Sequence, residues 1–404
     1  MNLNILIKSS KTLLAALLLC GIAPCAIAKP LKVFILAGQS NMQGHAAVST
    51  FDYIGDDPAT APLLKKMRGT DGKPRSCDKV WISSIGCLGD AYSDLTEKSG
   101  KLTAGFGAPE DKIGPEFTFG MTMEARLKEP VLLIKTAWGG RSLITDFRPP
   151  GAGSRKFNDF ILGQWKERGL DVEKESKDNN AKCGVYYIHM IEHVKKVLGD
   201  IKRVVPEHDP KEGYELAGFV WFQGFNDLVD NWSYPNQNKP GGYDEYGQLL
   251  AQLIRDVRKD LSAPKMPVVI GVMGIGGVKE DSKPGSQKIF REAQAAVAEI
   301  PEFNGNVAAV RTAPFWDDGL QLLQERMEAC WPKVDARVAA EKDTSWENKM
   351  KLMAENFTPE EWKRLQRGVS NAGYHYLGCA KTFALIGQAF AETNLDLLNS
   401  GRGK

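Results

Sequence analysis

The sequence predicts a single α/β domain in which helices cover both faces of a central parallel sheet. Two observations point to this class: short apolar runs bounded by Gly, Pro or Asn, and stretches of helical spacing between them. The composition agrees, since 43% of the 404 residues are hydrophobic and 25% are charged. The chain also holds 17 Phe, 10 Tyr and 9 Trp, enough aromatic bulk for a large core. A mainly disordered chain is therefore excluded.

Five apolar runs are typical of buried parallel strands, because they are short, continuous and rich in β-formers. They cover residues 33–37, 130–135, 217–222, 268–273 and 307–311. Apolar residues recur at helical spacing in residues 186–198, 249–257 and 290–300. Repeated strand–helix–strand units form an open parallel sheet, and ligands of such sheets bind at the carboxyl ends of the strands. Each loop that follows a strand is therefore a candidate site.

Two long insertions interrupt this pattern. The first, at about residues 50–111, is rich in Gly, Lys and Asp and contains an expected strand at 80–83. The second, at about residues 317–367, is highly charged, carries three Trp and is expected to be helical. Gly, Asn and Pro in residues 234–242 indicate an irregular loop. We predict one domain, residues 29–404, with these insertions.

The first 28 residues resemble a secretory signal peptide. Lys8 and Lys11 form a basic end, residues 13–20 form an apolar stretch too short to span a bilayer, and Ala26-Ile27-Ala28 offers a cleavage site. The predicted mature protein is periplasmic or secreted and has no membrane segment. Lys8 and Lys11 also account for the formal net charge of +2. The mature chain is then neutral, so a nucleic-acid partner has no compositional support.

Cysteine spacing indicates neither a zinc knuckle nor a redox centre, because no Cys-x-x-Cys occurs. Cleavage after Ala28 leaves an odd number of cysteines, so at least one thiol is free. Cys77 and Cys87 are the pair close enough in sequence to close a loop. The sequence gives no reason to invoke a cofactor.

Three loops that follow predicted strands carry residues suited to chemistry. The first strand leads into Gly38-Gln39-Ser40-Asn41-Met42, where a serine on a tight turn opens a helix beside a free backbone N–H. Taken alone, such a serine is more often a helix cap than a nucleophile. The second loop, residues 136–142, contains paired glycines, which let the backbone approach a ligand. The third, residues 223–227, surrounds a glycine with polar side chains.

These blocks together resemble the SGNH hydrolases, in the branch of sialate O-acetylesterases and carbohydrate esterase family six. The segment around Ser40 resembles the nucleophile block, residues 138–143 the glycine block, and residues 221–227 the Gln-Gly block. His375, within residues 373–378, resembles the histidine block. The four blocks occur in the family's order and span nearly the whole mature chain.

The resemblance implies a three-layer α/β/α, flavodoxin-like fold and serine ester hydrolysis without a cofactor. Ser40 would be the nucleophile and His375 the general base. The N–H of Ser40, a backbone N–H of Gly139 or Gly140 and a side-chain amide would form the oxyanion hole. The two candidates for that amide are Gln223 and Asn226.

The expected substrate is an acylated, most simply acetylated, oligo- or polysaccharide. Gln39, Trp138 and Arg141 are candidate substrate contacts: Trp138 by stacking on a sugar ring, Arg141 by pairing with a carboxylate or sulfate. Trp232 could stack on a sugar in the same way. Core packing is the competing interpretation for both tryptophans, and a surface ion pair is the competing one for Arg141. His45 follows the nucleophile block and is a candidate for lining the pocket.

The sequence departs from the family pattern at the group that orients the histidine. Phe225 and Ala372 occupy the positions at which the family commonly carries a Glu and an Asp. Asp227 is the nearest carboxylate in a matched block and is the favoured orienting acid. Asn371, as a neutral hydrogen-bond partner in a Ser-His dyad, is an alternative. Asp317 and Asp318 are further alternatives from the loop after the fifth strand.

Two rival functions belong to other classes. The missing acids are compatible with a carbohydrate-binding protein that has kept the fold and lost catalysis. His189 and His193, in His-x-x-Glu-His, have the spacing of an inverted zinc-protease motif. Apolar residues on the same stretch favour an ordinary amphipathic helix, so the metalloprotease is the less favoured alternative.

Overall fold

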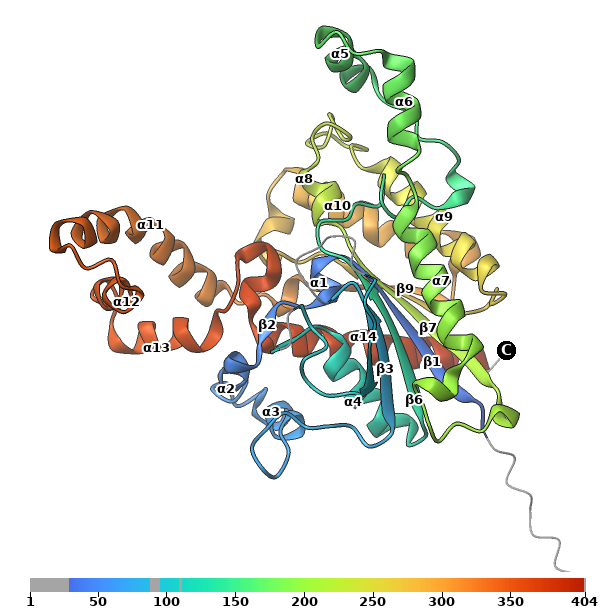
Figure 1. Cartoon of the computed structure of the whole chain (residues 1–404), viewed down its shortest axis with the longest axis horizontal. Coiled ribbons are helices and arrows are strands. Elements are labelled where there is room, and N and C mark those ends of the chain that lie inside the picture. The colour runs from blue at the N-terminus through green and yellow to red at the C-terminus, as the bar shows by residue number, and fades with distance from the viewer. Residues whose placement is uncertain (1–28, 88–94, 109–110, 403–404) are drawn as a thin grey trace, which may run out of the picture.

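The structure, a computed structural model, describes residues 29–87, 95–108 and 111–402. The predicted signal peptide, residues 1–28, lies outside them. Within these ranges a central sheet has the strand order β4-β3-β6-β1-β7-β8-β9, and all neighbours are parallel except β3 and β4 (Figure 1). The strands are β1 (Leu31–Gly38), β3 (Val80–Ile85), β4 (Lys98–Lys101), β6 (Val131–Ala137), β7 (Tyr214–Phe222), β8 (Val268–Val272) and β9 (Val307–Arg311). A small antiparallel pair joins β2 (Ala46–Ala47) to β5 (Lys112–Ile113).

Helices cover both faces of the sheet, so the chain forms the predicted three layers. Strand β1 explains why: Val33 and Ile35 point into an apolar cluster with one set of helices, while Phe34 and Leu36 point into a second cluster on the other face. The first cluster includes residues of α7 (Val185–Gly199), α9 (Asp244–Asp260) and α10 (Ser286–Ala296); the second includes residues of α4 (Glu116–Leu127) and α14 (Ala380–Arg402).

The sequence-based elements are confirmed. The five predicted runs lie in β1, β6, β7, β8 and β9, apart from residues 130 and 273, which lie one residue outside β6 and β8, and the three helical stretches lie largely in α7, α9 and α10. The strand expected within the first insertion is β3, which pairs with β6. The remaining helices are α1 (Ser40–Gln43), α2 (Phe51–Ile54), α3 (Ala61–Met67), α5 (Asp159–Glu167), α6 (Val172–Asn180) and α8 (Phe225–Val229).

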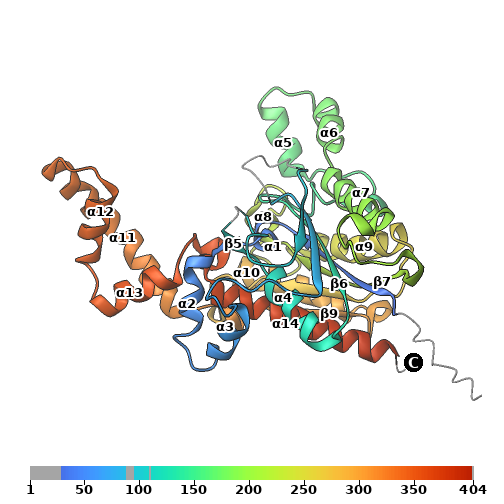
Figure 2. The ribbon, with the colours of Figure 1, turned by 60° about the horizontal axis from the view of Figure 1, so that its bottom comes forward.

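The second insertion is helical, as predicted, and projects from the body as an arm (Figures 1 and 2). It consists of α11 (Asp318–Glu341), α12 (Trp346–Ala354) and α13 (Pro359–Gly368). Val334, Val338, Leu352 and Met353 form a small apolar cluster inside it. The arm thus packs partly on itself. No helix among the described residues combines the length and apolar character needed to cross a bilayer.

The suggested Cys77–Cys87 loop closure is wrong. The cysteines at 77, 87, 183, 330 and 379 are all free thiols. Cys77 and Cys87 are both buried, and burial raises the pKa of each thiol. They therefore behave as small apolar side chains.

The sheet register brings the chemical blocks together. Gly38, the last residue of β1, pairs with Ala137 at the end of β6 and with Phe222 at the end of β7. The loops that follow these three strands therefore meet at one edge of the sheet. These are the loops that carry Ser40, Gly139 and Gln223.

Candidate active site

Ser40 opens helix α1 directly after β1. Gly38 makes the tight approach possible, because a Cβ atom there would lie only 2.1 Å from the carbonyl oxygen of Phe222. The N–H of Ser40, in the first turn of the helix, donates to no acceptor within the part of the chain that the structure describes. Its Oγ accepts from Gln39 Nε2 at 3.5 Å. Ser40 thus offers a hydroxyl beside a free backbone donor.

A buried ion pair stabilises the turn that carries Ser40. Lys135 Nζ donates to the carbonyl oxygens of Gln43 and Phe106 at 2.6 Å each, and to Glu116 Oε2 at 2.8 Å. The side chains of Lys135 and Glu116 are fully buried. The other carboxylate oxygen of Glu116 accepts from the N–H of Gly114 at 2.8 Å. Sequence reasoning missed this pair, although a lysine inside an apolar strand is an unusual signal.

Gln39 is not placed to bind substrate. It is buried, and its Oε1 accepts from the N–H groups of Gly224 and Asn226 at 3.1 and 3.3 Å, and from Gln223 Nε2 at 3.1 Å. Its Nε2 donates to Asn226 Oδ1 at 2.8 Å. The expectation of a substrate contact is therefore corrected: Gln39 joins the nucleophile turn to the loop after β7.

This network decides which amide can serve the oxyanion. Backbone N–H groups only donate, so the atom of Gln39 that they meet must be its oxygen, and its NH₂ group must face Asn226. The oxygen of Asn226 is thereby engaged, and its Nδ2 donates to no described residue. Gln223 Nε2, in contrast, meets three acceptors, Gln39 Oε1, the Arg141 carbonyl and Asp227 Oδ2. Asn226 is the available donor and Gln223 is not.

The glycine block lies beside the nucleophile. A Cβ atom on Gly139 would lie 4.0 Å from Ser40 Cβ and 3.0 Å from Gln43 Oε1. Within the described residues the N–H of Gly139 makes no hydrogen bond. Gly140 is exposed and has φ 71°, a conformation that favours glycine. Gly139 is therefore the better placed of the two candidate donors.

His375 lies in the short helical segment η9 (Gly373–Gly378), which contacts the nucleophile helix. Asn41 Nδ2 donates to the carbonyl oxygen of Tyr374 at 3.2 Å. Tyr376 and Leu377 adopt φ values of 52° and 59°, a conformation uncommon for residues other than glycine. The buried hydroxyl of Tyr376 holds this turn through Thr312 Oγ1 and the N–H of Gly274, at 2.7 Å each. Such strained backbone is typical of functional sites.

Asn371 orients the imidazole. His375 Nδ1 lies 2.8 Å from Asn371 Oδ1, which also accepts from the N–H of Ala372 at 2.8 Å. Because the Ala372 N–H can only donate, this atom of Asn371 is the oxygen, and Nδ1 must carry the imidazole proton. Nε2 is left unprotonated and able to accept a proton. Burial, with a smaller contribution from Lys112, lowers the pKa of His375 to about 4.

No hydrogen bond joins Ser40 to His375 in the described part of the chain. Their elements are in contact through Asn41 and Tyr374, and catalytic hydrogen bonds are often loose before substrate binds. The ring of His45 stacks on that of His375, with centroids 3.8 Å apart and planes 5° from parallel.

Asp227 does not reach His375. It is fully buried and accepts from the N–H groups of Leu143 and Ile144 at 2.7 and 3.0 Å, from Gln223 Nε2 at 2.6 Å and from the Tyr234 hydroxyl at 3.0 Å. Burial raises its pKa to about 6 despite these bonds. The interpretation of Asp227 as orienting acid is withdrawn, because its oxygens hold the glycine-block loop instead. The Asn371 alternative agrees with the geometry.

The other two candidate substrate contacts also need correction. Trp138 is only 1% exposed and packs in the core against Phe147 and Tyr186, so it cannot stack on a sugar without rearrangement. Arg141 lies over the Tyr186 ring and pairs with Asp146 at 3.3 Å. The competing interpretations, core packing and an ion pair, hold for these two residues.

The two histidines of α7 lie in different surroundings. His193 is buried, and its Nε2 lies 2.9 Å from Ser83 Oγ, which donates to Glu97 Oε1 at 2.7 Å. His189 packs against the rings of Trp138 and Tyr186. Among the residues described, no three His, Cys, Asp or Glu side chains gather as a metal site would require. The metalloprotease alternative gains no support from these positions.

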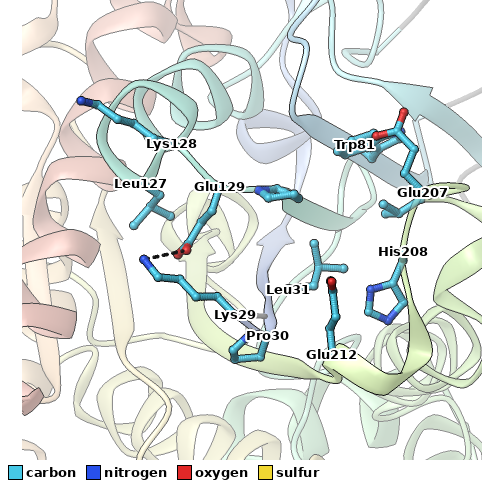
Figure 3. Close-up of a pocket in the computed structure, with 12 residues that line it drawn as sticks. Lys29, Pro30, Leu31, Trp81, Leu127, Lys128, Glu129, Glu207, His208 and Glu212 are labelled. Carbon is cyan, nitrogen blue, oxygen red and sulfur yellow. Dashed lines mark ion pairs between the residues drawn. The ribbon is translucent and has the colours of Figure 1, made fainter. Parts of the chain in front are cut away.

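A cavity of about 580 Å³ lies at the opposite edge of the sheet from Ser40 (Figure 3). Its lining includes Leu31, where β1 begins, Pro130, just before β6, and His208. Lys29 and Glu129 form an ion pair of 3.5 Å there. This cavity is separate from the candidate active site.

The three-layer fold thus brings a serine, a histidine and amide donors to the carboxyl edge of its sheet. The chain belongs to the family described as carbohydrate esterase, sialic acid-specific acetylesterase, whose profile matches residues 30–327. No curated protein matches the chain.

Solved structures resemble the chain at low sequence identity. A protein from Arabidopsis thaliana shares 19% identity, with 70% of this chain and 86% of that protein covered and a TM-score of 0.36. A carbohydrate acetylesterase from Xanthomonas citri shares 14%, with 70% and 51% covered and a TM-score of 0.40. NanS shares 12%, with 72% and 79% covered and a TM-score of 0.38.

Proposed function

We propose that this protein is a secreted or periplasmic serine esterase that removes O-acetyl groups, or similarly small acyl groups, from a carbohydrate. Membership in the carbohydrate esterase family supports the reaction class. The placement of Ser40 and His375 on adjoining elements supports their roles as nucleophile and general base. Asn371 takes the place of the usual acid.

The reaction proceeds in two halves. Ser40 Oγ attacks the acyl carbonyl carbon while its proton passes to His375 Nε2, and the oxyanion is held by the N–H groups of Ser40 and Gly139 and by Asn226 Nδ2. The tetrahedral intermediate then expels the sugar hydroxyl, which takes the proton back from His375. Water, deprotonated by His375, attacks acetyl-Ser40. The second tetrahedral intermediate expels Ser40 Oγ, which takes the proton from His375, and acetate is released.

One contact carries the proposal, the hydrogen bond between His375 Nδ1 and Asn371 Oδ1 at 2.8 Å. A general base must present an unprotonated nitrogen to the serine, and this bond selects that tautomer. Gln39 leaves the reaction unhindered, because its NH₂ group donates to Ser40 Oγ and the hydroxyl proton stays free to move.

We place the sugar beside His375, against the ring of Tyr374. Tyr374 is 47% exposed, and its ring lies 5.4 Å from that of Phe225, the residue at the family's usual Glu position. Trp232 is 36% exposed and packs edge-on against Phe160 at 5.5 Å. Exposed rings suit the apolar face of a sugar, so Tyr374, Trp232 and Phe160 are better candidates than the buried Trp138 for contacting the glycan.

Export rests on the sequence of residues 1–28, which the structure does not describe. Expression of the full chain with its leader, followed by N-terminal sequencing of the processed protein, tests it. We expect the processed chain to begin at Lys29.

Replacement of the nucleophile tests the proposal. Ser40→Ala should abolish acetate release from an aryl acetate and from acetylated xylan or sialosides, while the thermal unfolding midpoint stays within a few degrees of the wild type. The fold should tolerate the change because only one hydroxyl is removed. Near-wild-type turnover by the variant would contradict the assignment. A wild-type protein that binds acetylated glycans and releases no acetate would favour the binding-protein alternative.

A further inference from the structure

A second imidazole lies flat against the candidate general base. The rings of His45 and His375 are stacked with centroids 3.8 Å apart and planes 5° from parallel. Neither ring nitrogen of His45 has a hydrogen-bond partner among the described residues, although both are buried. His45 therefore meets its neighbour through its face rather than through its nitrogens.

Hydrogen bonds on both sides of His45 hold its segment against the segment that carries His375. Asn41 Nδ2 donates to the carbonyl oxygen of Tyr374, the residue before His375, at 3.2 Å. Ser370 Oγ accepts from the N–H of Ala47 at 3.1 Å and donates to the carbonyl oxygen of Gly378 at 2.7 Å. The segment that carries His45 is thus fastened to the histidine block at both of its ends. These backbone contacts hold the His45 and His375 rings in the stacked arrangement.

The charges around the stack keep His45 neutral. Burial first, then His375, Lys112 of β5 and Lys135 of β6 lower the pKa of His45 to about 3. Lys135 is itself paired with Glu116 of α4. When His375 takes the proton from Ser40, His45 consequently stays uncharged beneath it.

A triad acid does two things, and Asn371 can do only one of them. An acid fixes the tautomer of the imidazole and also stabilises the imidazolium formed during the reaction. The neutral amide of Asn371 fixes the tautomer through Nδ1. It brings no negative charge to the imidazolium. The face of a neutral aromatic ring does attract a cation at van der Waals distance.

We propose that His45 is a positioning residue that supports His375 with its ring face: it holds the imidazole in the plane that joins Asn371 to Ser40 and stabilises the imidazolium in place of the missing carboxylate. This inference rests on the proposed function, since it concerns the same general base. It assigns His45 no proton transfer, because neither ring nitrogen has a hydrogen-bond partner among the residues that the structure describes.

Two substitutions of similar size distinguish a role for the face of the His45 ring from a role in filling space. His45→Phe keeps a flat ring without nitrogens, and His45→Leu keeps apolar volume without a ring. We expect His45→Phe to retain kcat on an aryl acetate within about threefold, and His45→Leu to lose about tenfold or more with KM little changed. The unfolding midpoint of each variant is measured as the control for folding.

The pH profile supplies a readout that packing alone would not give. In His45→Leu the pKa of His375 should stay near or below its value of about 4, because the ring remains buried. The acid limb of kcat/KM should therefore not rise while kcat falls. An acid limb moving toward 6.5 would mean that water has entered, and that His45 only excludes solvent.

The other outcomes also decide the matter. Wild-type turnover by His45→Leu would show that the ring face is not used, and equal losses in the Phe and Leu variants would show that the nitrogens matter instead. Either result overturns the proposal and leaves the esterase assignment standing. If Ser40→Ala, assayed alongside, kept wild-type activity, the proposed function itself would fail, and this inference with it.

Discussion

In the mechanism that we propose, Asn371 replaces, in a neutral form, the carboxylate that orients the histidine in a Ser-His-acid triad. Its oxygen is identified by the backbone N–H of Ala372 and accepts from His375 Nδ1 at 2.8 Å. Asp227, although it lies within the Gln-Gly block, accepts with its oxygens from the backbone N–H groups of Leu143 and Ile144. The catalytic arrangement that we propose is therefore a Ser-His dyad in which the Asn371 amide supports the histidine.

We predict that Asn371→Leu lowers kcat on an aryl acetate at least about tenfold, with KM little changed. Without an acceptor at Nδ1 the imidazole of His375 is free to carry its proton on Nε2, the tautomer that cannot accept from Ser40. Steady-state kinetics on the purified variant measure the loss.

Asp227→Asn is the matched control. It places an amide NH₂ among four donors, so it should lower the unfolding midpoint but change the kcat of the folded protein only a few-fold. If Asp227→Asn instead lowered kcat a hundredfold while Asn371→Leu was silent, the orienting role would return to Asp227.

The pH dependence should reflect the lowered pKa of His375. The imidazole must be neutral to accept a proton, and it is neutral above its pKa. Because burial brings this pKa to about 4 from 6.5, the acid limb of kcat/KM should fall near pH 4 and activity should persist at pH 5. A limb near 6.5 would show that the base is a solvated histidine or that His375 is not the base.

At the scale of elements, the turn that carries Ser40 depends on the buried side chain of Lys135. Lys135 Nζ ties the carbonyl of Gln43, the last residue of α1, to Phe106 and to Glu116. Lys135→Met removes all three bonds and leaves the Glu116 carboxylate buried without its partner. We predict a loss of about 3–5 kcal/mol in the free energy of unfolding, measured by urea denaturation, and loss of esterase activity.

The double variant with Glu116→Gln tests the cause. Neutralising the orphaned carboxylate should recover a substantial part of the unfolding free energy, since the penalty comes from an unpaired buried charge. Equal stability of the single and double variants would mean that Glu116 is not charged beside Lys135 in the native protein.

The strands and helices were predictable, and much of the site was not, for a physical reason. Buried parallel strands and amphipathic helices have characteristic spacings of apolar residues in the sequence. For this reason β1, β6 and α7 could be predicted from apolar spacing alone. Hydrogen-bond partners across loops leave no such pattern. Which side chain meets Asp227, and whether Trp138 faces the core or the solvent, is decided by contacts with residues distant in sequence.

Residues inside the matched blocks were easier to place than their partners. Ser40 and the pair Gly139/Gly140 were identified by position within a block, and the sheet register does bring their loops together. Gln223 and Asn226 could not be told apart from sequence, because the choice depends on the network around Gln39. The only sign of the Lys135–Glu116 ion pair in the sequence was a lysine within an apolar run.

At the scale of the whole molecule, the parallel sheet gathers the candidate site at one edge, while the cavity of Figure 3 lies at the other. The helical arm of α11, α12 and α13 projects away from the body (Figure 2). The proposed chemistry thus depends on three loops and η9, which the sheet and the C-terminal segment hold together.

The most direct measurement is to trap the covalent intermediate. The wild-type enzyme is quenched in acid during turnover of an aryl acetate, digested and examined by mass spectrometry. We predict acetylation of the peptide that contains Ser40, at Ser40 itself, and no acetylated peptide from Ser40→Ala treated in the same way. Acetate release accompanied by acetylation of a different residue, or by full activity of Ser40→Ala, would contradict the account.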